Sequence, residues 1–404
     1  MQNNKLPKDW KWVKMGDVAT LSSQKHSPTK IEDLFYIGLE HIEKHTGKLT
    51  SKVGLDKITT IKNKFSKGDI LYGKLRPNLN KVYLSKEEGV CSTDILVLKL
   101  SKECLGKYLH PIMFSTSFVN KMSDNTSGVN LPRVSTKFIM NYEIPLPPLS
   151  TQTLIVSKIE ELFSELDKGF EDLKTAQQQL KTYRQSVLKY AFEGRLTNKK
   201  VKDGELPKGW EWKKISDISK VVRGGSPRPA GDPKYYDGDI PFLKVADLTK
   251  DNSIYLTTFK YTIKEAGLHK TRQIAPNTLL LTNSGATLGV PKICMINATM
   301  NDGVAAFLDL DERSNHYLYY FWVSKTLELR GINMGAGQPN LNTDLIKDYD
   351  LPYCSYEEQH QIVQEIESRL SVADKMEESI SQSLLQAEAL RQSILKKAFS
   401  GDLV

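Results

Sequence analysis

The fold is decided by RQSVLKYAFEGRL, residues 184–196, because the chain repeats this segment as RQSILKKAFSGDL at residues 391–403. Nine of the 13 positions are identical, and the offset is 207 residues. LPKDWKWVKMGDVA from Leu6 returns as LPKGWEWKKISDIS from Leu206, and IVSKIEELFSELDK from Ile155 returns more loosely as IVQEIESRLSVADK from Ile362. Three ordered matches at nearly one offset indicate an internal duplication.

Each copy begins with a variable block and ends with a helical block. The variable blocks contain most of the prolines and glycines, together with short apolar runs such as DILYGKL from Asp69 and TLLLTNS from Thr278. Such runs between turn residues are typical of strands mixed with some helix. We therefore expect mixed α/β domains at residues 1–149 and 198–354, followed by helical spacers at residues 150–197 and 355–404.

The helical blocks have apolar residues at heptad spacing, which indicates a coiled-coil seam. The seam residues expected from this spacing are Ile159, Leu166, Leu173, Leu180 and Val187 in the first helix and Ile366, Ala373, Ile380, Ala387 and Ile394 in the second. A second row is expected to run through Ile155, Leu162, Gly169, Ala176, Tyr183 and Tyr190, with a mixed counterpart from Ile362 to Lys397. We expect the two helices to pair with each other, each spanning roughly 65 Å at 1.5 Å per residue.

The helix ends also have sequence signals. Ser355 and Glu358 have the spacing of a capping box, and Gly194 and Gly401 stand where a left-handed C-cap is expected. The chain ends at the point where the first copy enters its linker. We therefore expect the two helices to form an antiparallel coiled coil, which would bring the C-terminus back to the segment that starts at Leu6 and relate the two domains by an approximate two-fold axis.

Composition is that of a soluble globular protein. Of 404 residues, 39% are hydrophobic and 26% are charged. The segment MQNNKLPKDW has no apolar core of a signal peptide, and no stretch approaches about 18 uninterrupted apolar residues, so we expect a cytoplasmic location. The four cysteines lie far apart without a C-x-x-C pair, which favours reduced thiols over disulfides or a zinc site.

The net charge of +8 is unevenly distributed. Residues 1–149 contain 23 lysines and arginines against 14 aspartates and glutamates, whereas residues 355–404 contain 5 against 9. A basic N-terminal third suits a polyanionic partner. A lysine-rich solvated surface explains the same charge equally well, so charge alone leaves both interpretations open.

Several strings imitate catalytic or metal-binding motifs. Residues 68–74 have the G-x-x-x-x-G-K spacing of a phosphate loop, but leucine follows where serine or threonine would hold magnesium. Residues 350–353 read DLPY rather than the DPPY of amino-methyltransferases. His41 and His45 lack the glutamate of H-E-x-x-H and a third ligand. We expect no catalytic residues, no metal site and no cofactor on this chain.

The chain resembles the specificity subunits of type I restriction-modification systems. The resemblance rests on the L-P-x-x-W openings at residues 6–10 and 206–210, the proline-rich exit at residues 145–152, the two RQS segments and the order of domain and helix. Inside the domains, GDILYGKLRPNLNKVYL from Gly68, CSTDILVL from Cys91, SGVNLPRVS from Ser127 and GDIPFLKVADL from Gly238 fit the recognition-domain pattern. In the second domain GAGQPNLN from Gly335 replaces the SGVNLPRVS of the first domain and departs from it in sequence.

The resemblance implies two target-recognition domains that read an asymmetric, two-part DNA target, one half each. The helices would set the unread gap and dock modification (methyltransferase) subunits, two of them being expected. A motor-nuclease subunit would join for cleavage, and S-adenosylmethionine, ATP and Mg²⁺ would be bound only by these partners. The assembled complex would be a site-specific deoxyribonuclease and adenine DNA methyltransferase.

Candidate DNA contacts follow from the chemistry of the two kinds of DNA group. Lysines suit phosphates, whereas arginine, asparagine and glutamine can read base edges. In the first domain the candidates are Lys74, Arg76, Asn78, Asn80, Lys81 and Arg133. In the second they are Arg223, Arg228, Tyr235, Tyr236, Asn283, Ser284, Thr287, Lys292, Gln338 and Asn340, the tyrosines as backbone contacts or as wedges that distort the duplex. A turn or surface role remains an alternative for each.

Two other functions remain open from the sequence. The chain could be the specificity half of a type II-like system with a fused nuclease-methylase, or a duplicated adaptor whose domains bind protein. Co-purifying partners and the presence or absence of a DNA preference discriminate among the three.

Overall fold

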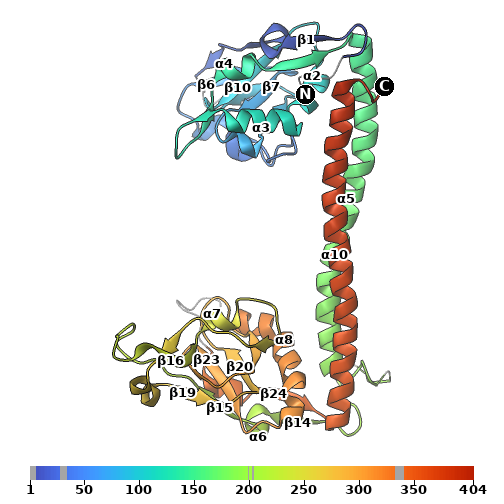
Figure 1. Ribbon diagram of the computed structural model, residues 1–404. Coiled ribbons are helices and arrows are strands. Elements are labelled where there is room, and N and C mark those ends of the chain that lie inside the picture. Colours follow the sequence, from blue (N-terminus) through green and yellow to red (C-terminus); the bar gives the residue numbers. More distant parts are fainter. Residues whose placement is uncertain (1–5, 28–33, 199, 203, 333–340) are drawn as a thin grey trace. The chain divides into compact units, whose positions relative to one another are not determined.

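The computed structural model describes residues 6–27, 34–198, 200–202, 204–332 and 341–404. It divides into two compact units, one formed by residues 1–174 and 381–404 and the other by residues 175–380 (Figure 1). Each unit contains one variable block and one end of each long helix. No helix within the described part of the chain is long and apolar enough to cross a membrane.

The described part of the first unit is built on two sheets and two short two-stranded ribbons. One sheet has the order β2-β10-β7-β8, with β2 (Ala19–Leu21), β10 (Ile95–Leu100), β7 (Ile70–Gly73) and β8 (Val82–Leu84). The other has the order β3-β6-β9-β4-β5, with β3 (Lys25–His26), β6 (Lys62–Phe65), β9 (Gly89–Cys91), β4 (Phe35–Ile37) and β5 (Val53–Gly54). β1 (Lys11–Lys14) pairs with β13 (Glu143–Leu146), and β11 (Thr126–Ser127) with β12 (Arg133–Val134). The helices are α1 (Met15–Val18), α2 (Gly106–Ile112), α3 (Thr116–Asp124) and α4 (Thr136–Met140).

The second unit repeats this plan. One sheet has the order β15-β23-β20-β21-β17, with β15 (Lys220–Arg223), β23 (Val304–Leu308), β20 (Thr278–Thr282), β21 (Pro291–Cys294) and β17 (Tyr255–Leu256). The other has the order β18-β16-β22-β19, with β18 (Thr262–Ile263), β16 (Tyr236–Leu243), β22 (Ala298–Met300) and β19 (Arg272–Ile274). β14 (Glu211–Lys214) pairs with β24 (Asp350–Tyr353). The helices are α6 (Ile215–Ile218), α7 (Val245–Leu248), α8 (Asn315–Ile332) and α9 (Thr343–Lys347).

Matching strand order confirms the duplication predicted from the sequence. The order β2-β10-β7-β8 corresponds to β15-β23-β20-β21. The parallel pair of β4 and β9 likewise corresponds to that of β16 and β22. A polar contact is also duplicated, because the hydroxyl of Tyr108 donates to the carbonyl of Pro145 and that of Tyr317 donates to the carbonyl of Pro352.

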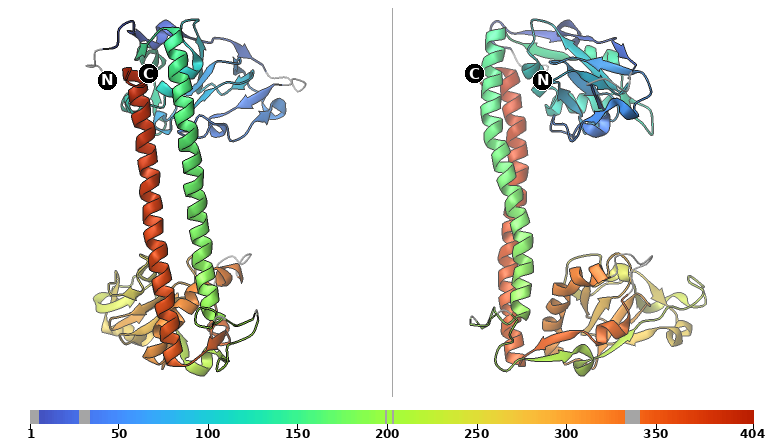
Figure 2. Two further views of the ribbon diagram at one scale, coloured as in Figure 1. Left: turned by 90° about the vertical axis from the view of Figure 1, so that its right-hand side faces the viewer. Right: turned by 180° about the vertical axis from the view of Figure 1, so that it is seen from behind.

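The two long helices are α5 (Leu149–Phe192) and α10 (Tyr356–Ser400). In the first unit the start of α5 shares a core with the end of α10, through residues such as Ile159 and Leu395. In the second unit the end of α5 shares a core with the start of α10, through residues such as Val187 and Ile366. Because start meets end in each unit, the predicted antiparallel pairing is confirmed within each unit (Figure 2).

The predicted first row of the seam lies inside each helix pair. Its members are buried except for Leu166, Leu173 and Ala387, which are half-buried. In the predicted second row Ile155 and Ile362 are buried, but towards the end of α5 the row is wrong by one residue. Tyr183 and Tyr190 are 40% and 44% exposed, whereas their neighbours Arg184 and Ala191 lie inward. Apolar pairs such as Ile155 and Val156 fit either row, and the inward position at residue 184 is charged, so hydrophobicity alone could not select the correct row.

Both helices end at a glycine in the left-handed region, as predicted. Gly194 has φ +72° and Gly401 has φ +86°. A Cβ atom added to Gly194 would collide with the ring of Pro207, and one added to Gly401 with the ring of Pro7. In the first unit the end of α10 therefore lies against the opening segment of the chain, as the sequence predicted.

The capping box expected at α10 forms in part. The amide of Glu358 donates to the hydroxyl of Ser355 (3.3 Å). The carboxylate of Glu358 accepts hydrogen bonds from Thr197 and Asn198, which follow α5. This glutamate therefore links the start of α10 to the end of α5. The four cysteines are buried free thiols.

Candidate nucleic-acid interface

The loop that follows β7 is held between two other segments of the first unit. The amide of Lys74 donates to the carbonyl of Asp94 (3.1 Å), and the amide of Val134 donates to the carbonyl of Lys74 (3.1 Å). The amide of Arg76 donates to the carbonyl of Pro132 (2.7 Å). These three bonds bring the loop, the residue before β10 and the strand β12 to one edge of the sheet.

A carboxylate lies at the centre of this edge. Arg133 donates through Nε to Oδ1 of Asp94 (3.1 Å) and through Nη2 to Oδ2 (3.3 Å). The ammonium of Lys74 lies 3.9 Å from the same Oδ1. Arg76 and Asn78 are exposed on the adjoining loop. The fold thus gathers Lys74, Arg76, Asn78 and Arg133, four of the residues predicted from the sequence.

Two other predicted residues of this domain point inward. Asn80 is 2% exposed, and its backbone carbonyl accepts a hydrogen bond from the amide of His45 (3.3 Å). The ammonium of Lys81 donates to the carbonyl of Leu39 (2.5 Å). In this structure the Asn80 side chain is enclosed and its Oδ1 has no hydrogen-bond partner among the described residues, while the half-buried Lys81 ammonium is bonded to backbone.

The corresponding loop of the second unit has the same backbone anchors. The amide of Asn283 donates to the carbonyl of Gly303 (3.0 Å), and the amide of Leu341 donates to the carbonyl of Asn283 (2.7 Å). Asn283 therefore corresponds to Lys74 and Gly303 to Asp94. The side chain of Asn283 is 0% exposed, and neither of its polar atoms has a hydrogen-bond partner among the described residues.

Three side chains in this unit meet at Asp302. The guanidinium of Arg223 donates through Nε to the carbonyl of Asp302 (2.5 Å), and Ser226 donates to its Oδ1 (2.6 Å). Nη2 of Arg228 lies 3.8 Å from Oδ2. Both predicted arginines are exposed, so they lie together at this edge.

Tyr235 and Tyr236, which the sequence suggested as backbone contacts or wedges, belong to a small hydrophobic core. The hydroxyl of Tyr236 donates to the carbonyl of Pro227 (2.7 Å). The ammonium of Lys270 donates to the hydroxyl of Tyr235 (3.1 Å) and lowers the pKa of that phenol. The two rings therefore brace the segment that carries Arg228.

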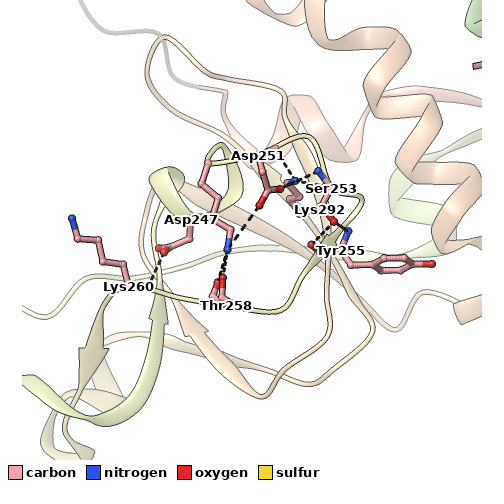
Figure 3. Close-up of polar contacts among 8 residues, drawn as sticks. Asp247, Asp251, Ser253, Tyr255, Thr258, Lys260 and Lys292 are labelled. Carbon is pink, nitrogen blue, oxygen red and sulfur yellow. Dashed lines mark hydrogen bonds and ion pairs between the residues drawn. The ribbon is translucent and has the colours of Figure 1, made fainter. Parts of the chain in front are cut away.

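Lys292 was expected to contact phosphate, but it is enclosed by the loop between α7 and β17 (Figure 3). Its side chain is 3% exposed and donates to Oδ1 of Asp251 (2.9 Å), to the Asp251 carbonyl (3.0 Å) and to the Ser253 carbonyl. An ammonium with these three acceptors has no donor left for a phosphate. Lys292 fastens the loop to β21.

The remaining predicted residues have mixed positions. Ser284 is half-buried beside Gly303, since a Cβ atom added to that glycine would lie 2.8 Å from the serine hydroxyl. Thr287 is half-buried, and its carbonyl accepts a hydrogen bond from Thr282 (2.7 Å). Gln338 and Asn340 lie outside the described residues.

Sequence reasoning missed Asp94 and Asp302, the carboxylates that organise the two edges. Each stands in a short turn just before a strand, in CSTDILVL and NDGVAAFL. A search for groups that bind a polyanion passes over acidic residues. Aligning the two copies of the repeat would have shown an aspartate in the turn before the same strand in each copy.

The fold defines a class of protein: an internally duplicated chain in which the two units gather different polar side chains at equivalent edges of equivalent sheets. The chain belongs to the family described as the type I restriction modification DNA specificity domain, whose sequence pattern matches residues 7–175 and 207–386.

Individual relatives agree with this assignment. The chain is 30% identical over 194 residues to the EcoDI specificity subunit of Escherichia coli, covering 48% of this chain and 43% of that protein. It is 28% identical over 308 residues to the EcoBI specificity subunit of Escherichia coli, covering 71% and 64% respectively. Less than two thirds of each of these relatives is therefore matched. The MjaVIII specificity subunit of Methanocaldococcus jannaschii is 23% identical, with 100% of this chain and 95% of that protein covered.

Solved structures share the fold. A chain from a type I R-M system, solved in work on complex assembly and conformational transition, has a TM-score of 0.82 at 22% identity and covers 98% of this chain and 99% of its own. The HsdS subunit of Thermoanaerobacter tengcongensis has a TM-score of 0.61 at 22% identity, with 99% of each chain covered.

Proposed function

We propose that this chain is the DNA-recognition subunit of a type I restriction-modification complex and reads one half of an asymmetric target with each domain. One observation carries the proposal: equivalent edges of equivalent sheets display different polar side chains. A duplicated protein that bound one ligand twice would be expected to repeat those side chains. Two dissimilar edges on one repeated frame suit two dissimilar half-sites.

The side chains at the edges have the chemistry that base reading requires. The guanidinium of Arg133 can present a fork of donors to guanine, and Asn78 can pair with adenine. Arg76, Arg223 and Arg228 are exposed nearby in their respective units. Lys74 supplies a positive charge for a phosphate, which raises affinity without selecting a sequence.

The paired helices complete the proposal. They hold the two domains at a set separation, which defines the unread gap, and they dock two methyltransferase subunits and the motor-nuclease subunits. S-adenosylmethionine, ATP and Mg²⁺ belong to those partners in this proposal. The chain itself selects the site and contributes no catalytic residue. The complex acts in the cytoplasm.

The test is to express the chain together with modification and motor subunits, purify the complex and select from a pool of random duplexes. We expect enrichment of one asymmetric, two-part sequence with a constant gap. Arg76→Ala should lower discrimination at one base pair of one half by about 1–3 kcal/mol.

The other functions predict different results. Co-purification of one fused nuclease-methylase would assign the chain to a type II-like system. Partner binding without any DNA preference would identify an adaptor and contradict the proposal. If the Arg76→Ala variant loses the same binding affinity for matched and mismatched duplexes, Arg76 does not read a base.

A further inference from the structure

The turns that precede β10 and β23 occupy the same place in the two units but carry their aspartates at different positions. Ile95 pairs with Gly73, and Val304 pairs with Thr282, so the two strands have the same register. Asp94 immediately precedes Ile95, whereas Asp302 lies two residues before Val304. The carboxylate has moved by one residue between the copies.

This shift changes the segment that the carboxylate holds. Asp94 pairs with Arg133, which lies on β12. The side chain of Asp302 instead accepts a hydrogen bond from Ser226 and lies 3.8 Å from Arg228, both in the segment that follows β15. Its carbonyl accepts from Arg223, the last residue of β15. Neighbouring residues of an extended turn point in different directions, which accounts for the change of partner.

The Arg133 guanidinium is left with a defined set of free donors. Of its five N–H groups, Nε and one hydrogen of Nη2 go to Asp94, and one hydrogen of Nη1 goes to the carbonyl of Leu131 (3.3 Å). Within the described part of the chain, one hydrogen on each terminal nitrogen has no acceptor. If Leu131 accepts the Nη1 hydrogen nearer to Cδ, the two remaining hydrogens are parallel donors, which match O6 and N7 of guanine in the major groove.

A carboxylate at an edge that meets DNA is otherwise unfavourable, because it repels phosphates. Its presence in both copies, each time beside arginines, points to a role exerted through those arginines. A guanidinium fixed at one end loses less conformational freedom when its other end binds.

We propose that Asp94 and Asp302 are positioning residues that select which arginine each domain presents to a guanine, Arg133 in the first domain and Arg228 in the second. This inference rests on the proposed function and deepens it. It assigns a guanine contact to each half-site. In each domain, the aspartate in the turn before β10 or β23 determines which arginine makes that contact.

The experiment uses the purified complex and the target found by duplex selection. Arg133→Ala and Arg228→Ala first identify the base pair that each arginine reads. Asp94→Asn should then reduce discrimination at the Arg133 base pair on the order of ten-fold. It should leave the other half-site unchanged, and Asp302→Asn should do the reverse.

Two further measurements separate positioning from a general structural role. Asp94→Asn removes a negative charge, so affinity for unrelated duplex should rise while discrimination falls. In an Arg133→Ala background Asp94→Asn should cause no further loss of discrimination. Asp9→Asn is the matched control, because this exposed residue loses the same charge in the opening segment of the chain and should keep full discrimination.

The outcomes are distinguishable. A wild-type complex without any sequence preference overturns the proposed function, and this inference with it. A wild-type complex that selects a target while Asp94→Asn and Asp302→Asn keep its full discrimination overturns this inference alone. This inference is also overturned if Asp94→Asn lowers discrimination further in an Arg133→Ala background, or if it lowers discrimination at both half-sites.

Discussion

The two domains have the same frame and different edges. Lys74 and Asn283 make corresponding backbone hydrogen bonds, yet one is a half-buried cation and the other an enclosed amide. Where the first domain has Asp94, the second has Gly303. These backbone hydrogen bonds fix the path of the loop, and they do not depend on which side chain the residue carries. Side chains at the edge can therefore diverge after duplication without altering the fold.

The paired helices show the same combination of repetition and divergence. Arg391 pairs with Asp167 in the first unit, and Arg184 pairs with Asp374 (2.6 Å) in the second, each at an offset of 207 residues. The surroundings differ, because Arg391 also lies over the ring of Phe163 (4.3 Å) whereas Arg184 also reaches Glu377 (2.9 Å). Both units thus place an arginine at the same point of the seam and pair it with an equivalent aspartate, and only the second contact of the arginine differs.

The largest expected effect comes from opening the seam in one unit at a time. Ile159 and Ile366 are equivalent and buried, so Ile159→Ala and Ile366→Ala should each lower the free energy of unfolding by about 2–5 kcal/mol. Hydrogen exchange measured by mass spectrometry should show the loss of protection mainly in the unit that carries the substitution. If either variant loses protection equally in both units, the two units do not unfold as separate cooperative units.

A smaller effect distinguishes two equivalent buried glutamines. Gln152 accepts from the amide of Leu105 and donates to the carbonyls of Glu103 and Pro147, each at 2.9 Å. Gln359 donates to the carbonyl of Cys354 (3.0 Å), and its Oε1 has no partner among the described residues.

Removing the better-bonded glutamine should therefore cost more. Gln152→Ala removes the partner of the Leu105 amide and of the Glu103 and Pro147 carbonyls, of which only the Pro147 contact is fully buried. It should therefore lower the free energy of unfolding by roughly 1–3 kcal/mol. Gln359→Ala should cost less, as measured by chemical denaturation. An equal cost for both would show that packing, rather than hydrogen bonding, dominates at this position.

The smallest effect concerns the two seam arginines. Arg184→Met and Arg391→Met should each change the free energy of unfolding by about 1 kcal/mol or less, because these ion pairs are partly exposed. The Arg184→Met effect should shrink more with added salt, since Arg184 interacts with two carboxylates and Arg391 also with a ring. Thermal melts at two salt concentrations give the comparison, and identical salt dependence would contradict it.

Much of the architecture was predictable from the sequence. Duplicated segments predicted two equivalent halves, heptad spacing predicted the paired helices, and Gly194 and Gly401 marked the helix ends. The second row of the seam was not predictable, because Arg184 occupies it and apolar periodicity cannot detect a charged residue held by a distant carboxylate. The candidate DNA contacts were predicted by residue type, which cannot distinguish the exposed Arg76 from the enclosed Lys292.

The sequence by itself determined the repeat, the class of each block and the direction in which the helices pair, because these depend on local periodicity and on copied segments. Only the tertiary structure decided which polar side chains face outward and which carboxylate holds which arginine. Those relations join residues that are far apart along the chain, as Asp94 and Arg133 are, and they exist only after the strands have set their register.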